Sequence, residues 1–540
     1  MFSFNIEHLK GDIFGGLTAA VVALPLALAF GVASGIGPIA GLYGAIAVGF
    51  FASLFGGTPA QVSGPTGPMT VVMGAIVAQH ANSLPEAFAI VFLGGALQIL
   101  FGLLRVGRYV SYTPYSVVSG FMSGIGVIII LIQVLPFFGM ETAPSGPLGA
   151  IRAWPAIVSG LKVDALAIGV VALAIMIFWP KNFQRFLPSP LAALIVGTLL
   201  AIIVLPAAPN IGSVPTGLPS LIMPVVDTSE LGPIIQAALI LALLGSIDSL
   251  LTSLVADSIT RTRHDSNREL IGQGIGNMIA GLIGGLPGAG ATMRTVVNVR
   301  AGGRTPISGM LHAVVLLGLV LGLGPLAERV PHAALAGILL KVGWDIIDWG
   351  YLKRIARAPR DKVVVMLVTL VLTVFVDLIT AVAVGIILAG FVTARWQEEE
   401  QLEGITTLAL PEGSASLTAA EHRELKKANG DVALVMLRGS FSYASAREMA
   451  ARVGAESAGH KAVIYDLTDA AHMDTSAALA LEELIEQAEE ENEACFISGM
   501  KGKARQTLES LNVMGCLPET RQFATRPEAI RAAVKLVLAK

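Results

Sequence analysis

Long apolar runs dominate the first 395 residues of the chain. Twelve of these runs have about the 17 to 25 residues that a helix needs to cross a bilayer. They lie near 13–34, 37–56, 87–104, 114–136, 164–180, 189–206, 232–256, 268–285, 305–324, 333–348, 362–377 and 379–395. Two further apolar segments, 66–78 and 291–299, are too short to cross alone and begin in Gly/Pro-rich sequence. The pattern therefore predicts fourteen membrane segments.

The two short segments take the third place in each set of seven. Their sequences repeat each other, because Thr70-Val71-Val72 and Thr295-Val296-Val297 lie 225 residues apart. Seven is an odd number, so two such units have opposite orientations in the membrane. Interrupted segments at matching positions of inverted halves indicate the substrate site of a transporter. The alternative is that they are ordinary loops or re-entrant pieces that bind no ligand.

Basic residues support this count. With the N-terminus inside, sixteen Lys and Arg residues fall on inner loops, and only Arg152, Lys162 and Arg329 fall outside. Cytoplasmic loops are enriched in Lys and Arg. We therefore expect an inner or plasma membrane protein with both termini in the cytoplasm.

The polar C-terminal part follows a different pattern. Apolar stretches at 432–439, 462–467 and 494–499 are typical of buried strands, and the segments between them have helical periodicity. This predicts a transmembrane domain over 1–395, and a linker with a small cytoplasmic α/β domain over 396–540. The acidic stretch 482–493 is interpreted as a solvated helix face rather than a partner site.

Composition narrows the class of protein. The chain is 54% hydrophobic and 14% charged, with a mean hydropathy of +0.72 and a net charge of −3. These values exclude a soluble enzyme, and they exclude a nucleic-acid binder that relies on a basic face. Cys495 and Cys516 form no CxxC motif, so we expect reduced structural thiols. The first apolar stretch is too long for a signal peptide and is expected to be retained.

Asp248 is the carboxylate that the sequence places deep inside a long span. Such a group costs on the order of 3 kcal/mol in hydrocarbon, which makes it a candidate functional residue. Thr252 lies one helical turn further, on the same face. A carboxylate beside a hydroxyl suits a small hard cation. The structural alternative is an interhelical hydrogen bond, or a pair with a buried cation such as Lys341.

The short segments favour the opposite charge. Helices that begin near the midplane present free N–H groups and a dipole end of about +0.5 charge to an anion. Thr66 and Thr292 add hydroxyl donors at the two starts. Glycines at these turns allow close approach of the backbone: Gly64, Gly67, Gly288 and Gly290. No GKS or GKT follows either turn, so a phosphate loop is not indicated.

Two further groups of charged residues are candidates for a role at the site. Arg294 could line the anion site or extend toward the cytoplasmic side, and a supporting role through its field is favoured. Lys341, Asp345 and Asp348 are interpreted as a local pair at the end of a span.

These residues resemble those of the SulP (sulfate permease) anion transporter family, and the C-terminal part resembles a STAS domain. The strings GPTGPMTVVM, LLGSIDSLLTS, ELIGQGIGN and GGLPGAGATMRTVVN are most similar to cyanobacterial BicA-type sodium-dependent bicarbonate transporters. The resemblance implies a polytopic α-helical fold of seven plus seven inverted repeats, with core and gate domains. It also implies an elevator-like movement and a homodimer.

The resemblance further implies particular site residues. Sodium would be held by Asp248, Thr252, Gly290 and Thr292, and bicarbonate would lie between Thr66-Gly67 and Ala291-Thr292. No organic cofactor is implied. In related STAS domains a serine at a strand-to-helix turn is phosphorylated, and Ser476 matches it, with Thr475 second. A plain helix cap is the favoured interpretation of that turn, and a regulatory partner is left open.

The expected function is non-enzymatic secondary transport of bicarbonate with sodium. One sodium cancels the charge of Asp248, and the two helix ends of about +0.5 each leave a total of about +1. One monovalent anion balances this charge. Three alternatives remain. They are a SulP carrier for sulfate or a dicarboxylate, a proton-coupled carrier in which Asp248 titrates, and an anion channel or motor-like protein.

Overall fold

The chain forms two compact units in a computed structural model. The structure describes residues 6–79, 83–110, 113–141, 146–180, 183, 187–211, 219–225, 231–376, 378–408 and 417–539. The first unit is Met1–Ala389 and the second is Gly390–Lys540, with the division inside one long helix. Each unit is described separately below.

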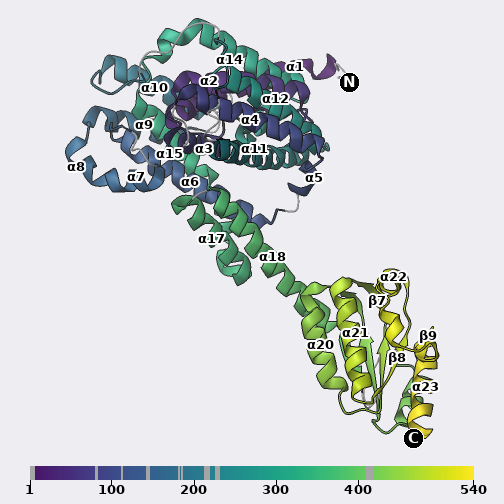
Figure 1. Ribbon diagram of the computed structural model, residues 1–540. Coiled ribbons are helices and arrows are strands. Elements are labelled where there is room, and N and C mark those ends of the chain that lie inside the picture. Colours follow the sequence, from purple (N-terminus) through teal and green to yellow (C-terminus); the bar gives the residue numbers. More distant parts are fainter. Residues whose placement is uncertain are drawn as a thin grey trace. The chain divides into compact units, whose positions relative to one another are not determined.

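The first unit is built of helices that coincide with the fourteen predicted segments (Figure 1). The first seven are α1 Ile6–Ala33, α2 Pro38–Phe55, α3 Gly67–Gln79, α4 Leu84–Leu103, α6 Tyr115–Phe137, α9 Val163–Phe178 and α10 Ser189–Ile203. The second seven are α11 Leu231–Thr260, α12 Ser266–Leu282, α13 Thr292–Arg300, α14 Pro306–Ala327, α15 His332–Ile346, α17 Arg360–Phe375 and α18 Leu378–Glu403. Short connecting helices are α5 Gly107–Val110, α7 Gly146–Ala153, α8 Ile157–Gly160 and α16 Trp349–Leu352.

The lengths of these helices differ from the prediction of twelve full spans. Among the described residues, six helices are long and apolar enough to cross a membrane singly, and α7–α8 with α9 make a seventh bent by 120°. Others are shorter, such as α10 and α15 with 15 residues each. A helix of that length rises only about 23 Å, less than the hydrocarbon thickness. The sequence thus predicted the positions of the helices better than their lengths.

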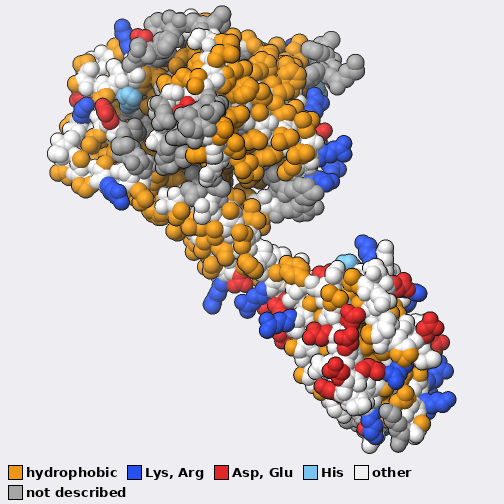
Figure 2. Space-filling view, viewed as in Figure 1, with side chains coloured by type: hydrophobic (Ala, Val, Ile, Leu, Met, Phe, Trp, Pro, Cys, Tyr) orange, Lys and Arg blue, Asp and Glu red, His pale blue; other side chains and the backbone are white. Residues whose placement is uncertain are grey.

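The surface of the first unit is apolar where Figure 2 displays it. Large side chains such as Phe14, Leu103 and Phe178 are more than half exposed. Small residues fill the interior, including many alanines of α1, α2 and α15 with almost no exposure. An apolar exterior around a tightly packed helical interior is what a bilayer requires.

Two very short strands bring the short helices together. β1 (Ser63–Gly64) pairs antiparallel with β2 (Ala289–Gly290), and Ser63 lies opposite Gly290. Helix α3 begins three residues after β1, and α13 begins two residues after β2. The starts of both short helices are therefore held at one crossing point inside the first unit.

The second unit contains a five-stranded sheet in the order β3-β4-β6-β8-β9. The strands are β3 Ile405–Leu408, β4 Val432–Leu437, β6 Ala462–Asp466, β8 Ala494–Ser498 and β9 Gln522–Phe523, and only β3 is antiparallel to its neighbour. A separate pair joins β5 Gly439–Phe441 to β7 Ala470–Met473.

Helices cover both faces of this sheet. One apolar cluster joins the sheet to α20 Tyr443–Ser457, α21 Thr475–Glu490 and α22 Gly502–Ser510. The other joins it to α19 Ala419–Lys426 and α23 Arg526–Ala539. The three predicted strands are confirmed as the central strands, which are buried on both faces. The short edge strands β3 and β9 were not predicted, because they lack a continuous apolar run.

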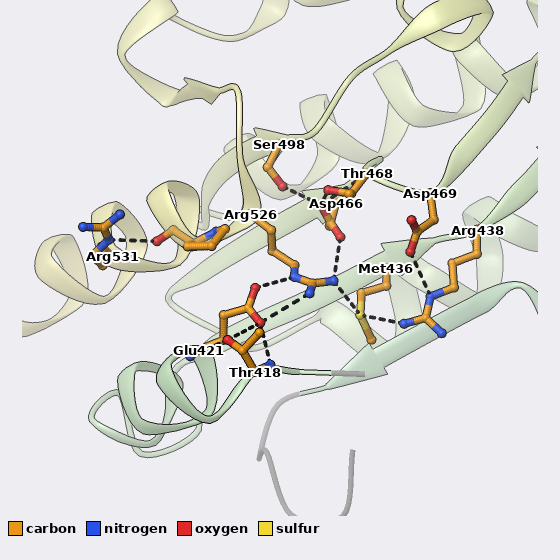
Figure 3. A network of polar contacts seen from close by, with 11 residues as sticks. Thr418, Glu421, Met436, Arg438, Asp466, Thr468, Asp469, Ser498, Arg526 and Arg531 are labelled. Carbon is orange, nitrogen blue, oxygen red and sulfur yellow. Dashed lines mark hydrogen bonds and ion pairs between the residues drawn. The ribbon is translucent and has the colours of Figure 1, made fainter. Parts of the chain in front are cut away.

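A buried ionic network secures α19 and α23 to the sheet (Figure 3). Arg526 Nε lies 2.8 Å from Glu421 Oε1, and its Nη1 lies 3.4 Å from Asp466 Oδ2. Ser498 donates a hydrogen bond to Asp466 Oδ1 at 2.8 Å. Burial alone would raise the pKa of Glu421, but hydrogen bonds from Arg526 and Thr418 hold it below its usual range.

Candidate anion and cation site at the β1–β2 crossing

The polar face of helix α11 lies against the crossing of β1 and β2. Asp248 is 7% exposed and Thr252 is fully buried, one helical turn apart as the sequence predicted. The two residues contact different short segments, Asp248 at the start of α3 and Thr252 at β2 and the start of α13. One helix face thus connects both halves of the repeat.

The start of α3 is joined to Asp248 by one hydrogen bond. Thr66 Oγ1 donates to Asp248 Oδ2 at 2.8 Å. Thr66 precedes the first residue of α3, where a threonine commonly caps the helix. Here its hydroxyl hydrogen is given to the carboxylate. Among the described residues no backbone N–H of α3 donates to Thr66 Oγ1, so the first N–H groups of the helix are available to a ligand.

The start of α13 is joined to Thr252. Thr252 Oγ1 donates to the Gly290 carbonyl at 2.9 Å and lies 2.8 Å from Thr292 Oγ1. Gly290 N donates to Ser249 Oγ at 3.0 Å. Ala291 N, in the same peptide plane as the Gly290 carbonyl, donates to the Val62 carbonyl at 2.9 Å and fixes the orientation of that plane. Of the expected sodium residues, Thr252, Gly290 and Thr292 are thus in contact through their oxygens, and Asp248 lies one helical turn before Thr252 on the same face of α11. Oxygen donors with a single carboxylate suit a small hard cation.

Arg294 is buried behind the crossing. It is 2% exposed, so it does not extend to the cytoplasmic surface, which was one of its two predicted positions. Its Nη2 donates to the Pro65 carbonyl, just before Thr66. Among the residues that the structure describes, no carboxylate lies within ion-pair distance of Arg294. Its charge therefore adds to the positive field at the start of α3. The charge balance drawn from the sequence counted only one sodium, Asp248 and the two helix ends, and did not include Arg294.

At two positions of the crossing, neighbouring atoms leave no room for a side chain larger than that of glycine. Gly64 has a φ of 148°, and a Cβ there would lie 2.7 Å from Arg294 Nη1. A Cβ on Gly288 would lie 2.5 Å from the backbone carbon of Gly64. These glycines allow the two turns to cross in contact, which agrees with their predicted role.

Several supporting residues were missed by the sequence reasoning. Asn277 holds Gly288 from both sides, with its Oδ1 2.7 Å from Gly288 N and its Nδ2 2.9 Å from Gly288 O. Glu269, 1% exposed, accepts hydrogen bonds from the backbone N–H groups of Gly57 and Thr58 and from two glutamine side chains. The available signal was the spacing of Glu269, Gln273 and Asn277, which places polar groups on one face of α12.

The charged residues at the end of α15 have polar partners of their own. Lys341 Nζ lies 2.5 Å from Asp345 Oδ1, so the local pair is confirmed and Lys341 is not the partner of Asp248. Asp348 does not join this pair. It accepts hydrogen bonds from Tyr115 and Ser119 of α6, both at 2.7 Å.

A cavity of about 450 Å³ lies along α3 beyond the crossing. Its walls come from the end of α1, from α3, from α6 and from the end of α17. Thr70, one turn after Thr66, is among its lining residues. Space for a small solute therefore extends to within one helical turn of Thr66.

The STAS-like turn carries the two candidate regulatory residues on its surface. Asp474 caps α21, because its Oδ1 accepts from Ala477 N at 2.9 Å. Thr475 and Ser476 follow it and are exposed. The favoured helix-cap interpretation therefore applies to Asp474. The role of Thr475 and Ser476 stays a prediction.

The two cysteines are free, as predicted. Cys495 is buried in the core between sheet and helices, and burial raises the pKa of its thiol to about 12. A thiol of this kind reacts slowly, which fits a packing role.

Comparisons with known proteins match both units. The profile of the sulfate permease family matches residues 9–369, and that of the STAS domain matches residues 424–529. The bicarbonate transporter BicA of Picosynechococcus sp. is 44% identical over 541 residues, covering 98% of this chain and 95% of that protein.

Solved structures agree with this assignment. The transmembrane domain of a cyanobacterium bicarbonate transporter BicA is 50% identical, with a TM-score of 0.66, and covers 70% of this chain and 98% of that one. SLC26A9 is 17% identical and shows the shared fold alone, with a TM-score of 0.82 over 99% of this chain and 91% of that one. The chain therefore belongs to the sulfate permease family of multi-pass anion transporters, with a C-terminal STAS domain.

Proposed function

We propose that this anion transporter takes up bicarbonate together with sodium. The observation that supports the proposal is that one face of α11 places Asp248 against Thr66 at the start of α3, and Thr252 against Gly290 and Thr292 at the start of α13. Sodium is bound by these oxygens, and bicarbonate lies between Thr66-Gly67 and Ala291-Thr292. The similarity to two bicarbonate transporters named BicA, at 44% and 45% identity, supports the choice of anion.

Electrostatics supports cotransport at this site. An ionised Asp248 repels an anion at the start of α3, and a bound sodium removes that repulsion. Each ligand therefore raises the affinity of the other, as linkage requires. One sodium with one bicarbonate moves no net charge, so a membrane potential has little effect on the driving force.

The route across the membrane is proposed from the fold. The crossing and its supporting helices move past α6, α9, α15 and α17 in an elevator-like step. The protein lies in the inner or plasma membrane, with both termini in the cytoplasm, and forms a homodimer. A monodisperse monomer in mild detergent would count against the dimer.

Uptake of labelled bicarbonate into proteoliposomes tests the function. At alkaline pH, where little of the label is CO2, uptake is saturable and falls to background when choline replaces sodium. Uptake that is unchanged in choline would contradict sodium coupling.

The same assay separates the rival functions. An excess of sulfate or of a dicarboxylate leaves the uptake of label intact if bicarbonate is the substrate. Uptake that follows the proton gradient at constant sodium would instead favour a proton-coupled carrier. Uptake that does not saturate would favour a channel.

A further inference from the structure

We infer that the hydroxyl hydrogens of Thr66 and Thr292 couple the cation to the anion, because each serves one of the two ions at a time. The inference rests on the proposed function and deepens it. It concerns how one site transmits the binding of sodium to bicarbonate.

The hydroxyl of Thr66 can serve only one acceptor at a time. A threonine hydroxyl has one hydrogen and two lone pairs. The hydrogen of Thr66 is given to Asp248 Oδ2 at 2.8 Å. Both residues are less than one-tenth exposed, so bulk water does not readily replace this bond. Thr66 therefore cannot donate to an anion at the start of α3 while it donates to Asp248.

The same count holds at Thr292. Thr252 gives its hydrogen to the Gly290 carbonyl at 2.9 Å, so the 2.8 Å contact between the two threonines uses the hydrogen of Thr292. The hydrogens of both candidate anion ligands are thus directed to oxygens of the proposed sodium site. One hydroxyl lies at the start of each short helix.

A sodium ion reverses this preference. When it coordinates the Asp248 carboxylate, the Gly290 carbonyl and the Thr252 hydroxyl, its charge repels nearby hydroxyl hydrogens. The hydrogens of Thr66 and Thr292 then rotate toward the anion, while their lone pairs face the cation. A hydroxyl rotates about a single bond, so the exchange requires no movement of the backbone. Sodium therefore supplies the anion with two donors that it otherwise lacks.

The test measures binding of labelled sodium to the purified full-length protein, with and without bicarbonate. In the wild type, bicarbonate lowers the sodium concentration for half-saturation about tenfold, within the usual range of coupling between sites. In Thr66→Val, which keeps the shape of the side chain but has no hydrogen to donate, this factor falls close to one. Sodium binding without bicarbonate is retained, because Asp248 keeps its charge. Thr66→Ser restores the factor.

The matched control is Thr70→Val on the next turn of α3. The Thr70 hydroxyl donates to the Thr66 carbonyl at 2.7 Å and is 4% exposed, so the change removes a buried hydroxyl from the same helix. Its coupling factor stays at the wild-type value. Thr292→Val, at the second hydroxyl, also lowers the factor, and it weakens sodium binding without bicarbonate as well, because Thr292 supplies an oxygen to the proposed sodium site. This variant covers the case in which Thr66→Val does not fold.

The outcomes distinguish the inference from the function. Wild-type coupling that persists in Thr66→Val or in Thr292→Val overturns the inference and leaves the proposed function intact. A loss of coupling in Thr70→Val as large as in Thr66→Val also overturns it, since a general effect on α3 then explains the data. A wild type without any coupling overturns both.

Discussion

Asp248 is a buried carboxylate on α11, within a membrane helix. It is 7% exposed, and in the described part of the chain its side chain is bonded only to Thr66. Neutral hydrogen-bonding partners are a weak compensation for a buried carboxylate. The buried Arg294 also attracts Asp248, but the two side chains are not within ion-pair distance among the described residues. A cation that coordinates the carboxylate directly is therefore the natural further partner.

Asp248→Asn tests this role. The amide has nearly the shape of the carboxylate but no charge, so sodium loses its only anionic ligand. We expect sodium stimulation of bicarbonate uptake to disappear, while the amount of folded protein stays close to that of the wild type. Initial uptake rates over a range of sodium concentrations check this. Full sodium stimulation in the variant would remove Asp248 from the coupling site.

Residue identities at the crossing were predictable, but their bonding was not. Asp248 was predicted because a carboxylate within an apolar run is conspicuous, and the threonines because their segments repeat. The burial of Arg294 depends on the carbonyl of Pro65, 229 residues away in sequence. Such a contact leaves no periodic signal in the chain. The same is true of the bond between Gly290 and Ser249.

At the scale of elements, α12 positions the turn that leads to β1. Glu269 accepts four N–H hydrogen bonds, two from backbone groups at 57–58 and two from Gln61 and Gln273. A carboxylate with four donors and no cationic partner in the described residues acts as a structural anchor. It fixes the entry to β1 without touching the proposed ligands.

Glu269→Ala is expected to destabilise the first unit. Four buried donors lose their acceptor, and an apparent melting temperature lower by roughly 5 °C or more follows. Thermal unfolding of the detergent-purified protein checks this. Glu399→Gln is the control, because the Glu399 side chain is 67% exposed and should shift the melting temperature little. An unchanged melting temperature for Glu269→Ala would show that the anchor is dispensable.

The STAS domain has its own anchor in Glu421, and this anchor is sensitive to pH. The pKa of Glu421 lies below its usual value in the folded domain. Its contribution to stability is therefore complete above the pKa of the unfolded state, and it is lost as pH falls through the folded pKa. Breaking this buried pair costs on the order of 3 kcal/mol.

Cleavage by pepsin in mildly acidic buffers measures that loss in the full-length protein. We expect cleavage within residues 417–539 to increase as pH falls below the usual pKa of glutamate. Glu421→Gln is cleaved more readily at every pH, with a weaker pH dependence. The exposed Glu483→Gln serves as the control and behaves like the wild type. Equal pH profiles for wild type and Glu421→Gln would contradict the assignment.

Elements were predicted well where one physical signal dominates. Long apolar runs gave the membrane helices, and fully buried strands gave β4, β6 and β8. The helices α7 and α8 were missed, because residues 146–160 are too short and too mixed to show a period. The pairing of β1 with β2 was also missed, since two residues per strand carry no alternation.

At the scale of the whole molecule, the site belongs entirely to the first unit. The residues proposed to bind both ions lie between 66 and 292, and the division into units falls at Ala389. The end of α18 is fixed within the second unit, where Gln401 accepts hydrogen bonds from Ser442 and Ser445. The STAS domain is thus bound to the last helix but contributes nothing to the proposed ion ligands.

Removal of residues 405–540 is expected to leave selectivity unchanged. The truncation exposes the end of α18, so assembly, surface abundance or turnover falls. Uptake normalised to surface protein, measured with competing anions, checks this. A different order of preference among anions in the truncated protein would show that the STAS domain takes part in selection.

The most direct test of coupling is uphill transport in proteoliposomes. Vesicles start with equal labelled bicarbonate on both sides and with sodium outside only. The account predicts that bicarbonate accumulates transiently above its equilibrium level, and that an ionophore that dissipates the sodium gradient abolishes the accumulation. Accumulation that survives collapse of the sodium gradient, or no accumulation in vesicles that transport bicarbonate downhill, would contradict it.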